Sequence, residues 1–415
     1  MAYIHDLAVR ARRASVALSM ADTATKNAAL AAMANAIDAA RDAILEANAQ
    51  DIDAATKNGL SAQLIERLTL NDARIDGICD GIRNVMGLPD PIGETIDAFT
   101  TETGLDIRKI RVPFGVIGII YEARPNVTAD AAALCLKAGS AVILRGGKEA
   151  IRSNTALVTA MREGLAAIGQ DPDVLLLVED TSRETATAMM KLNGLIDVLI
   201  PRGGAGLIRT LVENATVPVI ETGTGNCHVY VDAAADIEMA KNIIVNAKAS
   251  RPSVCNAAET LLVHKDIAAN ALPVLANALK AAGVSLRACD RAGAQIPFET
   301  APATEQDFAT EFLDYILAVK VVDSLDDAVA HIRRYTTGHS ECIVTADETA
   351  AARFVAAIDA AVVYVNASTR FTDGGEFGYG AEIGISTQKL HARGPMGLRE
   401  MTSMKYIVHG NGQVR

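Results

Sequence analysis

Two long stretches of this chain alternate between short apolar runs, rich in valine, isoleucine and leucine, and longer segments with helical periodicity. The first stretch extends from residue 113 to about residue 220, and the second from residue 236 to residue 365. Apolar runs without polar alternation are typical of parallel strands that helices cover on both faces. The pattern therefore predicts an α/β fold of two doubly wound domains in tandem.

The apolar runs and the periodic segments give the expected elements. The strands are expected at residues 116–121, 141–144, 174–178, 198–200 and 217–220, then at 259–264, 316–322, 341–345 and 361–365. The helices are expected at residues 128–138, 149–168, 183–192 and 203–213, then at 236–247, 266–281, 325–334 and 348–358. Ligands of such domains bind outside the carboxyl ends of the strands, so the turns that follow the strands are the candidate sites.

The chain before residue 113 follows other patterns. Residues 1–85 are rich in alanine and carry apolar residues at helical spacing, which predicts a group of helices. Residues 96–112 alternate and predict an antiparallel hairpin with a turn at Thr103-Gly104. An isolated hairpin is marginally stable in water, so we expect this arm and the extended segment 405–409 to pair across a subunit boundary in a homo-oligomer.

A single cysteine stands in the stretch Ser250-Arg251-Pro252-Ser253-Val254-Cys255-Asn256, just before a buried strand. Pro252 fixes its own φ and favours extended backbone at Arg251, so the loop before the thiol is expected to be stiff. A thiol on a rigid loop can meet a substrate at a fixed angle. Two interpretations stay open: a catalytic nucleophile, and a small apolar filler, which is how most free cysteines behave.

Glycine turns with cations follow two strands of the first series. They are Arg145-Gly146-Gly147-Lys148 and Arg202-Gly203-Gly204. Glycine lets a backbone approach a phosphate closely, and the start of the following helix offers N–H donors to an anion. Neither turn has the glycine spacing of the dinucleotide fingerprint. Each could be a simple turn, but two on one sheet favour a nucleotide site.

Three further polar residues lie near strand ends. Asn126 precedes an expected helix and is either a helix cap or an amide donor to an oxyanion. Glu221, before another glycine turn, is either a solvated loop acid or a functional carboxylate. His339 precedes a strand without a visible partner, and we interpret it as structural.

Composition excludes several classes of protein. The formal net charge of −11 argues against a nucleic-acid-binding surface, which needs clustered basic residues. The six cysteines are scattered without the spacing of a zinc site, which indicates free thiols and a reducing compartment, and we expect no metal. No signal peptide and no run long enough to cross a bilayer is visible. We expect a cytoplasmic protein.

Several long motifs resemble one family. Phe114-Gly115-Val116-Ile117-Gly118-Ile119-Ile120-Tyr121-Glu122-Ala123-Arg124-Pro125-Asn126-Val127-Thr128 resembles the signature of the γ-glutamyl phosphate reductases, which belong to the aldehyde dehydrogenase superfamily. The stretch around Cys255 and the stretches 366–375 and 380–396 resemble the same family. The resemblance covers essentially the whole chain. It implies a fold with a cofactor domain, a catalytic domain and an oligomerisation hairpin.

The resemblance also implies roles for individual residues. Cys255 corresponds to the nucleophile, and Asn126, with the backbone N–H of Cys255, to the oxyanion site. The residues that correspond to cofactor contacts, or lie on the cofactor side, are Arg145, Gly147, Lys148, Arg202, Gly203, Gly204, Glu221 and Glu311. Among them, Glu221 stands where the superfamily has its general base, and Glu311 where it has the glutamate that holds the nicotinamide ribose. The turn at Arg202-Gly203-Gly204 departs from the usual superfamily spelling. Candidates for the substrate's charged groups are Arg124, Arg251 and Arg370.

The implied reaction is reduction of L-glutamate 5-phosphate to L-glutamate 5-semialdehyde through a cysteine thioester, as a step of proline biosynthesis. Lys148 stands where NAD-dependent relatives often carry a glutamate, and with Arg145 it flanks the first glycine turn, so NADPH is the expected cofactor. Functional coupling to glutamate 5-kinase is a possible partnership. Two alternatives stay open: a CoA-acylating aldehyde dehydrogenase, and a nucleotide-binding interaction protein with an inert thiol.

The expected domains follow from the patterns and the resemblance together. They are a cofactor-binding domain of residues 1–95 and 113–232, an oligomerisation arm of residues 96–112 and 400–415, a catalytic domain of residues 233–369, and a return segment of residues 370–399.

Overall fold

The structure is a computed structural model that describes residues 2–415, apart from the side chain of Gln63. The chain divides into two compact units. The first unit holds the chain up to Glu221 together with Gly378–Gly384 and Met396–Arg415, and the second holds Thr222–Phe377 and Ile385–Pro395. The second unit thus begins earlier than the boundary at residue 233 that the sequence suggested.

The first unit is built on a parallel sheet of four strands in the order β5-β4-β3-β6. The strands are β3 (Val116–Tyr121), β4 (Ala141–Arg145), β5 (Leu175–Leu177) and β6 (Val198–Arg202). The connections from β3 to β4 and from β4 to β5 advance in one direction, and the connection from β5 to β6 returns. Because parallel crossovers are right-handed, the helices of the two directions cover opposite faces of the sheet.

Helices account for most of the rest of this unit. They are α1 (Ala2–Ser19), α2 (Thr23–Ala39), α3 (Arg41–Lys57), α4 (Ala62–Leu68), α5 (Asp72–Gly87), α6 (Pro125–Lys137), η1 (Lys148–Ala150), α7 (Ile151–Ala167), η2 (Pro172–Val174), α8 (Arg183–Met189) and α9 (Ala205–Asn214). The helices predicted within residues 1–85 are confirmed. Leu30, Met33 and Ile37 form a fully buried stripe on α2, and Asp22 caps its start by accepting the N–H of Thr25.

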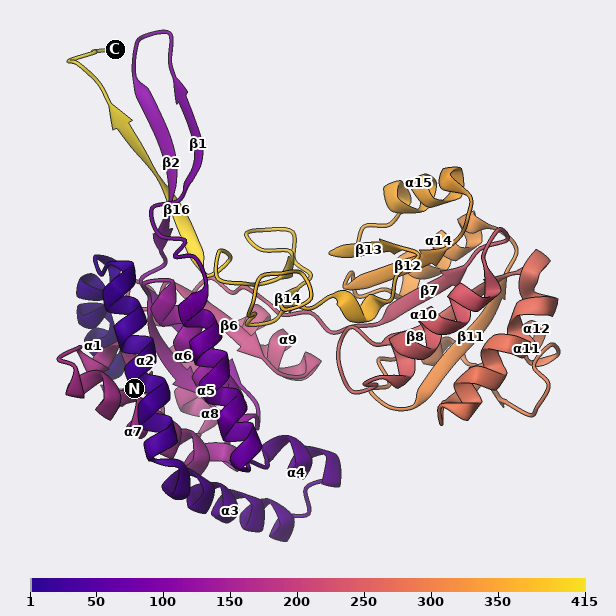
Figure 1. Cartoon of the computed structure of the whole chain (residues 1–415), viewed down its shortest axis with the longest axis horizontal. Coiled ribbons are helices and arrows are strands. Elements are labelled where there is room, and N and C mark those ends of the chain that lie inside the picture. The colour runs from indigo at the N-terminus through magenta and orange to yellow at the C-terminus, as the bar shows by residue number, and fades with distance from the viewer. Residues whose placement is uncertain (1) are drawn as a thin grey trace. The chain divides into compact units, whose positions relative to one another are not determined.

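The predicted arm is present as an antiparallel sheet of three strands, β1 (Thr95–Thr100), β2 (Asp106–Pro113) and β16 (Thr402–His409) (Figure 1). Gly104, with φ of +82°, makes the predicted turn of the hairpin. The expected pairing of 96–112 with 405–409 across a subunit boundary is wrong, because β16 pairs with β2 of its own chain from Thr402 to His409. The C-terminal strand covers one edge of the hairpin, and β1 keeps a free edge in this sheet.

The second unit is built on a parallel sheet of seven strands in the order β10-β9-β11-β8-β7-β12-β13. These strands are β7 (Cys227–Val231), β8 (Ala258–His264), β9 (Ser285–Ala288), β10 (Ala301–Pro302), β11 (Ile316–Val322), β12 (Ser340–Val344) and β13 (Val362–Val365). Its helices are α10 (Ile237–Ala249), α11 (Lys265–Ala281), α12 (Asp290–Gly293), α13 (Glu305–Phe308), α14 (Leu325–Tyr335), α15 (Glu348–Ala357) and η3 (Thr369–Phe371). The short strands β14 (Ile385–Ser386) and β15 (Gly394–Pro395) pair antiparallel.

Alternate residues of the central strands face two separate hydrophobic layers. In β8, Leu261 and Val263 pack in the layer that holds α10 and α11, and Leu262 packs in the layer that holds α14 and α15. A strand covered on both faces has no solvent side, which explains why its sequence lacks polar alternation. The expected doubly wound architecture of this unit is confirmed.

Several details differ from the expected elements. Residues 217–220 form an isolated bridge between Val219 and Leu199 and not a strand, because Pro218 has no N–H to donate to a sheet. β7 and β9 were not expected. Both are short, and β7 contains His228, so neither has the long apolar run that marks β8 and β11. In the part of the chain that the structure describes, no helix combines the length and apolarity needed to cross a bilayer.

Candidate active site

Cys255 lies in the loop of residues 250–257 that joins the end of α10 to the start of β8. The six cysteines are free thiols, and among them Cys255 and Cys289 are partly exposed. The other four are buried, and burial raises the pKa of Cys342, for example, to about 12. Such thiols stay protonated at neutral pH and are unreactive. Cys255 is partly exposed and lies in a predicted motif, so it is the candidate reactive thiol.

The neighbouring Asn256 attaches this loop to η3 and the residue that follows it. Its amide group donates to the carbonyl oxygens of Arg370 and Thr372, at 3.3 and 3.0 Å, and its own carbonyl oxygen accepts the hydroxyl of Thr369 at 2.7 Å. Its side-chain oxygen also accepts from the guanidinium of Arg370. The backbone next to the thiol therefore has fixed partners on both sides.

Gly225 lies directly against the nucleophile loop. A Cβ at this position would overlap the carbonyl oxygen of Cys255, so no larger residue fits. The N–H of Gly225 donates to the carboxylate of Glu311 at 2.7 Å. Burial raises the pKa of Glu311, and the bond from Gly225 opposes that rise. The structure thus brings two predicted site residues, Cys255 and Glu311, to the same glycine.

Two predicted cationic residues also meet near Cys255. Arg370 donates from Nε to the hydroxyl of Ser250 at 3.1 Å. Its pKa is lowered, first by burial and then by the positive charge of Arg251, while the Cys255 thiolate opposes that change. These groups are close enough to feel one another's charge, and a cationic neighbourhood favours a thiolate and an anionic substrate. The third candidate, Arg124, belongs to the first unit.

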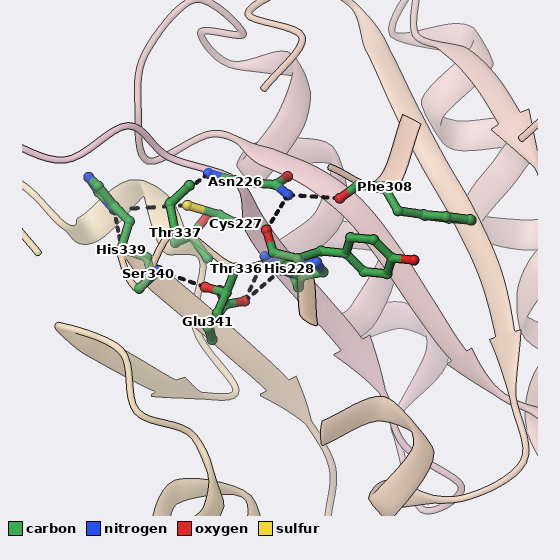
Figure 2. A network of polar contacts seen from close by, with 12 residues as sticks. Asn226, Cys227, His228, Phe308, Thr336, Thr337, His339, Ser340 and Glu341 are labelled. Carbon is green, nitrogen blue, oxygen red and sulfur yellow. Dashed lines mark hydrogen bonds and ion pairs between the residues drawn. The ribbon is translucent and has the colours of Figure 1, made fainter. Parts of the chain in front are cut away.

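A network of polar contacts supports the turn before β7 (Figure 2). Asn226 donates from its amide group to the carbonyl oxygens of Phe308 and Tyr335, at 2.8 and 2.7 Å, and its N–H donates to Thr337 Oγ1 at 3.0 Å. Thr337 in turn donates to the carbonyl oxygen of Thr224 at 2.5 Å. The segment that carries Gly225 is therefore held from both ends.

His339 belongs to the same network and is fully buried. Its Nδ1 lies 2.8 Å from Ser340 Oγ and 3.9 Å from Cys227 Sγ (Figure 2). Burial lowers the pKa of His339 to about 4, so the ring is neutral at pH 7. These contacts support the structural interpretation of this histidine.

In the first unit, the predicted motifs gather at one edge of the sheet. Tyr121, Arg145 and Arg202 end the neighbouring strands β3, β4 and β6, and the pairing register places Arg145 and Arg202 beside the last residues of β3. The turns with Gly146-Gly147 and Gly203-Gly204 follow directly. The two glycine turns that the sequence singled out therefore lie at the same edge of the sheet, on either side of the end of β3.

The first turn packs tightly on buried polar groups. A Cβ on Gly146 would overlap the amide nitrogen of Asn154 and lie 3.1 Å from the ring of Tyr121. Asn154 accepts the hydroxyl of Thr128 at 2.9 Å, and Thr128 lies 2.7 Å from the hydroxyl of Tyr121. The backbone of the turn packs against these hydrogen-bonded side chains. Asn154 was not predicted, because a single asparagine on a helix gives no signal in sequence.

The two cations of this turn have different surroundings. Arg145 donates to the carbonyl oxygens of Thr181 and Ser182, at 2.6 and 3.3 Å. Burial lowers the pKa of Arg145, and the charges of nearby carboxylates oppose that change. Lys148 begins η1 and is exposed. One cation is thus tied to the protein, and the other can reach a ligand in solvent.

The second turn already holds a carboxylate. The N–H of Gly204 donates to Glu122 Oε1 at 3.0 Å, and a Cβ on Gly203 would come within 2.6 Å of the same side chain. Glu122 therefore occupies the start of α9, where a negative charge is favourable. The sequence predicted a phosphate contact at this turn and gave no sign of this carboxylate.

Asn126 lies in the first turn of α6, after Pro125. The N-cap of this helix is Arg124, so the interpretation of Asn126 as the cap is wrong. Asn126 is exposed and donates from its amide nitrogen to Asp130, one turn later, at 3.1 Å. Burial raises the pKa of Asp130 to about 6, and the bond from Asn126 and the charge of Arg202 both act against the rise. The second amide hydrogen of Asn126 remains for another acceptor.

Comparisons with known proteins agree on one family. Residues 3–297 match the aldehyde dehydrogenase family. The γ-glutamyl phosphate reductase of Carboxydothermus hydrogenoformans is 58% identical over 410 residues, with 99% of each chain covered, and that of Enterococcus faecalis is 59% identical over 412 residues, again with 99% of each.

The chain belongs to the γ-glutamyl phosphate reductase branch of the aldehyde dehydrogenase family. The crystal structure of the γ-glutamyl phosphate reductase of Thermotoga maritima agrees, with a TM-score of 0.97, 49% identity and 99% of each chain covered. The chain is thus an oxidoreductase with the aldehyde dehydrogenase fold, and the resemblance seen in its sequence is confirmed.

The roles of individual site residues are inferred from the groups that surround each one. Glu221 is the last residue of the first unit's main segment and is partly buried. Within residues 2–415, no three histidine, cysteine, aspartate or glutamate side chains gather in a way that could hold a metal ion.

Proposed function

We propose that the protein reduces L-glutamate 5-phosphate to L-glutamate 5-semialdehyde and phosphate with NADPH, as a step of proline biosynthesis in the cytoplasm. The observation that carries this proposal is the full-length similarity to γ-glutamyl phosphate reductases at 58–59% identity, joined to a partly exposed thiol beside two arginines. The second unit carries the nucleophile, and the first binds the cofactor.

The first half of the reaction uses the second unit. The thiolate of Cys255 attacks the acyl carbon, the bond from that carbon to the phosphate oxygen breaks with its electron pair, and phosphate leaves. A thioester on Cys255 remains. Arg251 and Arg370 stabilise the anionic substrate, and Arg124 is a further candidate for one of its charged groups. The firm attachment of Asn256 keeps the thiol at one angle of attack.

The second half begins when the thioester carbon accepts a hydride, which NADPH supplies when bound. The carbonyl oxygen takes up negative charge in both tetrahedral states. Asn126 and the backbone N–H of Cys255 donate to this oxygen, and each such donor stabilises it by roughly 3 kcal/mol. The hemithioacetal then collapses, the C–S bond breaks, and the Cys255 thiolate returns with the aldehyde released. No step of this sequence requires Glu221 as a base.

The residues of the first unit fit a phosphorylated dinucleotide. The Gly146-Gly147 turn leaves no room for a Cβ, and Arg145 and Lys148 flank it. Arg202, Gly203 and Gly204 would form the second contact with a bound nucleotide, and Glu311 in the second unit would bind the nicotinamide ribose. A 2′-phosphate adds negative charge near Lys148, which favours NADPH over NADH.

The arm makes a homo-oligomer the expected state. Its strands expose the large side chains of Ile96, Phe99, Met404, Tyr406 and Val408. Apolar side chains on a projecting sheet are typical of an interface between subunits. Functional coupling to glutamate 5-kinase fits the lability of an acyl phosphate, because direct transfer shortens its exposure to water.

A coupled assay tests the proposed reaction. Glutamate, ATP and a glutamate kinase generate the acyl phosphate in place, and oxidation of NADPH is followed by its absorbance. Turnover that depends on all four components is expected. NADPH oxidation with acyl-CoA thioesters and none with the acyl phosphate would point to a CoA-acylating enzyme, and no turnover with either would contradict the proposal.

A further inference from the structure

A fully buried ion pair closes the two ends of the nucleophile loop. Lys248 is in the last turn of α10, just before the loop, and Glu259 is near the start of β8, just after it. Their Nζ and Oε2 atoms lie 2.6 Å apart, and neither side chain is exposed to solvent. Since the loop of residues 250–257 leaves α10 and enters β8 between these two residues, the pair joins its ends.

The same carboxylate reaches a second loop. Glu259 Oε1 accepts the N–H of Leu313 at 3.3 Å. Leu313 has φ of +55°, a left-handed backbone that a leucine adopts only where its surroundings hold it. Glu311, two residues earlier, bonds the N–H of Gly225 at 2.7 Å. Gly225 in turn leaves no space for a side chain against Cys255. One buried carboxylate is thus linked to the loops of both Cys255 and Glu311.

A buried ion pair is a poor way to gain stability. Removing two charges from water costs much of the free energy that their attraction returns, and apolar side chains of the same volume often serve as well. Here burial lowers the pKa of Lys248 and raises the pKa of Glu259 to about 7, and each charge opposes the shift of the other. A role in geometry accounts for the placement of this pair better than a role in stability.

We infer that Lys248 and Glu259 are positioning residues. They hold the Cys255 loop (residues 250–257) and the loop that carries Glu311 (residues 309–315) in a fixed position relative to each other. Loss of the ion pair leaves the unit folded and loosens the Cys255 loop, and loss of the bond from Leu313 to Glu259 also loosens the loop that carries Glu311. The inference rests on the proposed function only in the roles it gives to Cys255 and Glu311. The contacts themselves stand without it.

Two double variants separate the effect of the ion pair from the effect of the hydrogen bond between Leu313 and Glu259. Single replacements leave a buried charge without a partner and threaten folding, so both residues are changed together. Lys248→Met/Glu259→Gln removes the ion pair and keeps an oxygen for the N–H of Leu313. Lys248→Met/Glu259→Leu removes both. The matched control is Lys26→Met/Asp90→Asn, which removes a buried lysine and its partly buried carboxylate partner, 2.6 Å apart, in the first unit.

Amide hydrogen exchange is the first readout, because it needs neither substrate nor cofactor. We expect both Lys248 variants to lose protection at residues 250–257, and only the Leu variant to lose it at residues 309–315. The control should keep wild-type protection in both segments. In the wild-type protein, the N–H of Leu313 should be protected like the interior of β8. Rapid exchange there would overturn the inference even if no variant folds.

Kinetics is the second readout. Both Lys248 variants should lose roughly a hundredfold in kcat, the effect of a misplaced reacting group. Only the Leu variant should also raise the KM for NADPH, by about tenfold, as one lost contact does. Wild-type exchange and kinetics in both variants, or protection lost evenly over the unit, would make the pair purely structural. If the wild type fails to reduce the acyl phosphate, the exchange results still decide this inference.

Discussion

The Gly146-Gly147 turn of the first unit and the nucleophile loop of the second are both short connections, but they are held in different ways. Neutral groups hold the turn: Asn154, Thr128 and Tyr121 pack beneath it, and Lys148 remains in solvent. The loop is held by the neutral Asn256 and also, at its two ends, by a pair of charged groups without any exposed surface. Exposed charges are screened and contribute little each, whereas a buried charge that loses its partner costs several kcal/mol. The difference suits one region to recognising a ligand and the other to fixing a reacting atom.

The largest expected effect is at the nucleophile. Cys255→Ala should lower kcat by roughly 10⁴-fold or more while fold and NADPH binding stay intact, because no other group can form the thioester. Cys289→Ala, which removes the other partly exposed thiol, should keep wild-type turnover. The coupled assay measures both, and substantial activity in Cys255→Ala would remove Cys255 from the mechanism.

The buried groups of the second unit also predict that the free energy of unfolding depends on pH. The unfolded chain protonates His339 near its ordinary pKa of 6.5, but the folded chain does so only near 4. Protons therefore favour unfolding as the pH falls from 6.5 to 4, by about 3 kcal/mol for this group.

His339→Asn should flatten that part of the curve of unfolding free energy against pH, measured by urea titration. The exposed His409, changed to Gln, is the control and should leave the slope unchanged. Burial lowers the pKa of His331 to about 2, so this histidine adds to the slope over the same range and part of the slope should remain. A slope equal to that of the wild type in His339→Asn would place the effect in other groups.

Asn126→Ala tests the first unit's contribution to the chemistry. If its amide donates to the oxyanion, kcat should fall roughly a hundredfold with little change in KM. Asn214→Ala, at the exposed end of α9, should behave like the wild type. A loss of only a few-fold would leave Asn126 with its bond to Asp130 and no part in the reaction.

Lys148→Glu tests recognition by an exposed charge. The kcat/KM for NADPH should fall about tenfold to a hundredfold, because a charge-assisted contact becomes a repulsion, and the value for NADH should change little. Lys191→Glu is the control, as an exposed lysine away from the turn. Unchanged NADPH kinetics would place the 2′-phosphate elsewhere.

The smallest effect is expected at Glu221. Phosphate departure and hydride transfer need no activated water, so Glu221→Gln should keep most of the reductase activity. A loss as large as that of Cys255→Ala would show that this carboxylate takes part in a step assigned here to other groups.

Much of the fold could be predicted because its signals are local. The mostly apolar runs of β8 and β11 and the alternation of the hairpin each follow from residues next to one another in sequence. β7 was missed because five residues with a histidine give too weak a pattern. The pairing of β16 with β2 joins residues far apart in the chain, and the sequence could not say whether the partner was its own hairpin or another subunit's.

The candidate site shows the same limit. Cys255, the glycine turns and Asn126 stand in motifs and could be named from the sequence. Their supports could not, because Glu122, Asn154 and Glu259 act on segments that only folding brings near. Burial turns Asn154 and Glu259, which are ordinary surface residue types, into parts of the site, and no local pattern encodes it.

The most direct measurement is a rapid acid quench of the enzyme with the kinase, glutamate and ATP in the absence of NADPH, followed by digestion and mass spectrometry. The thioester mechanism predicts a γ-glutamyl group on the peptide that carries Cys255, its disappearance when NADPH is added before the quench, and no adduct in Cys255→Ala. Full NADPH-dependent turnover without any adduct, or with the adduct on another residue, would contradict it.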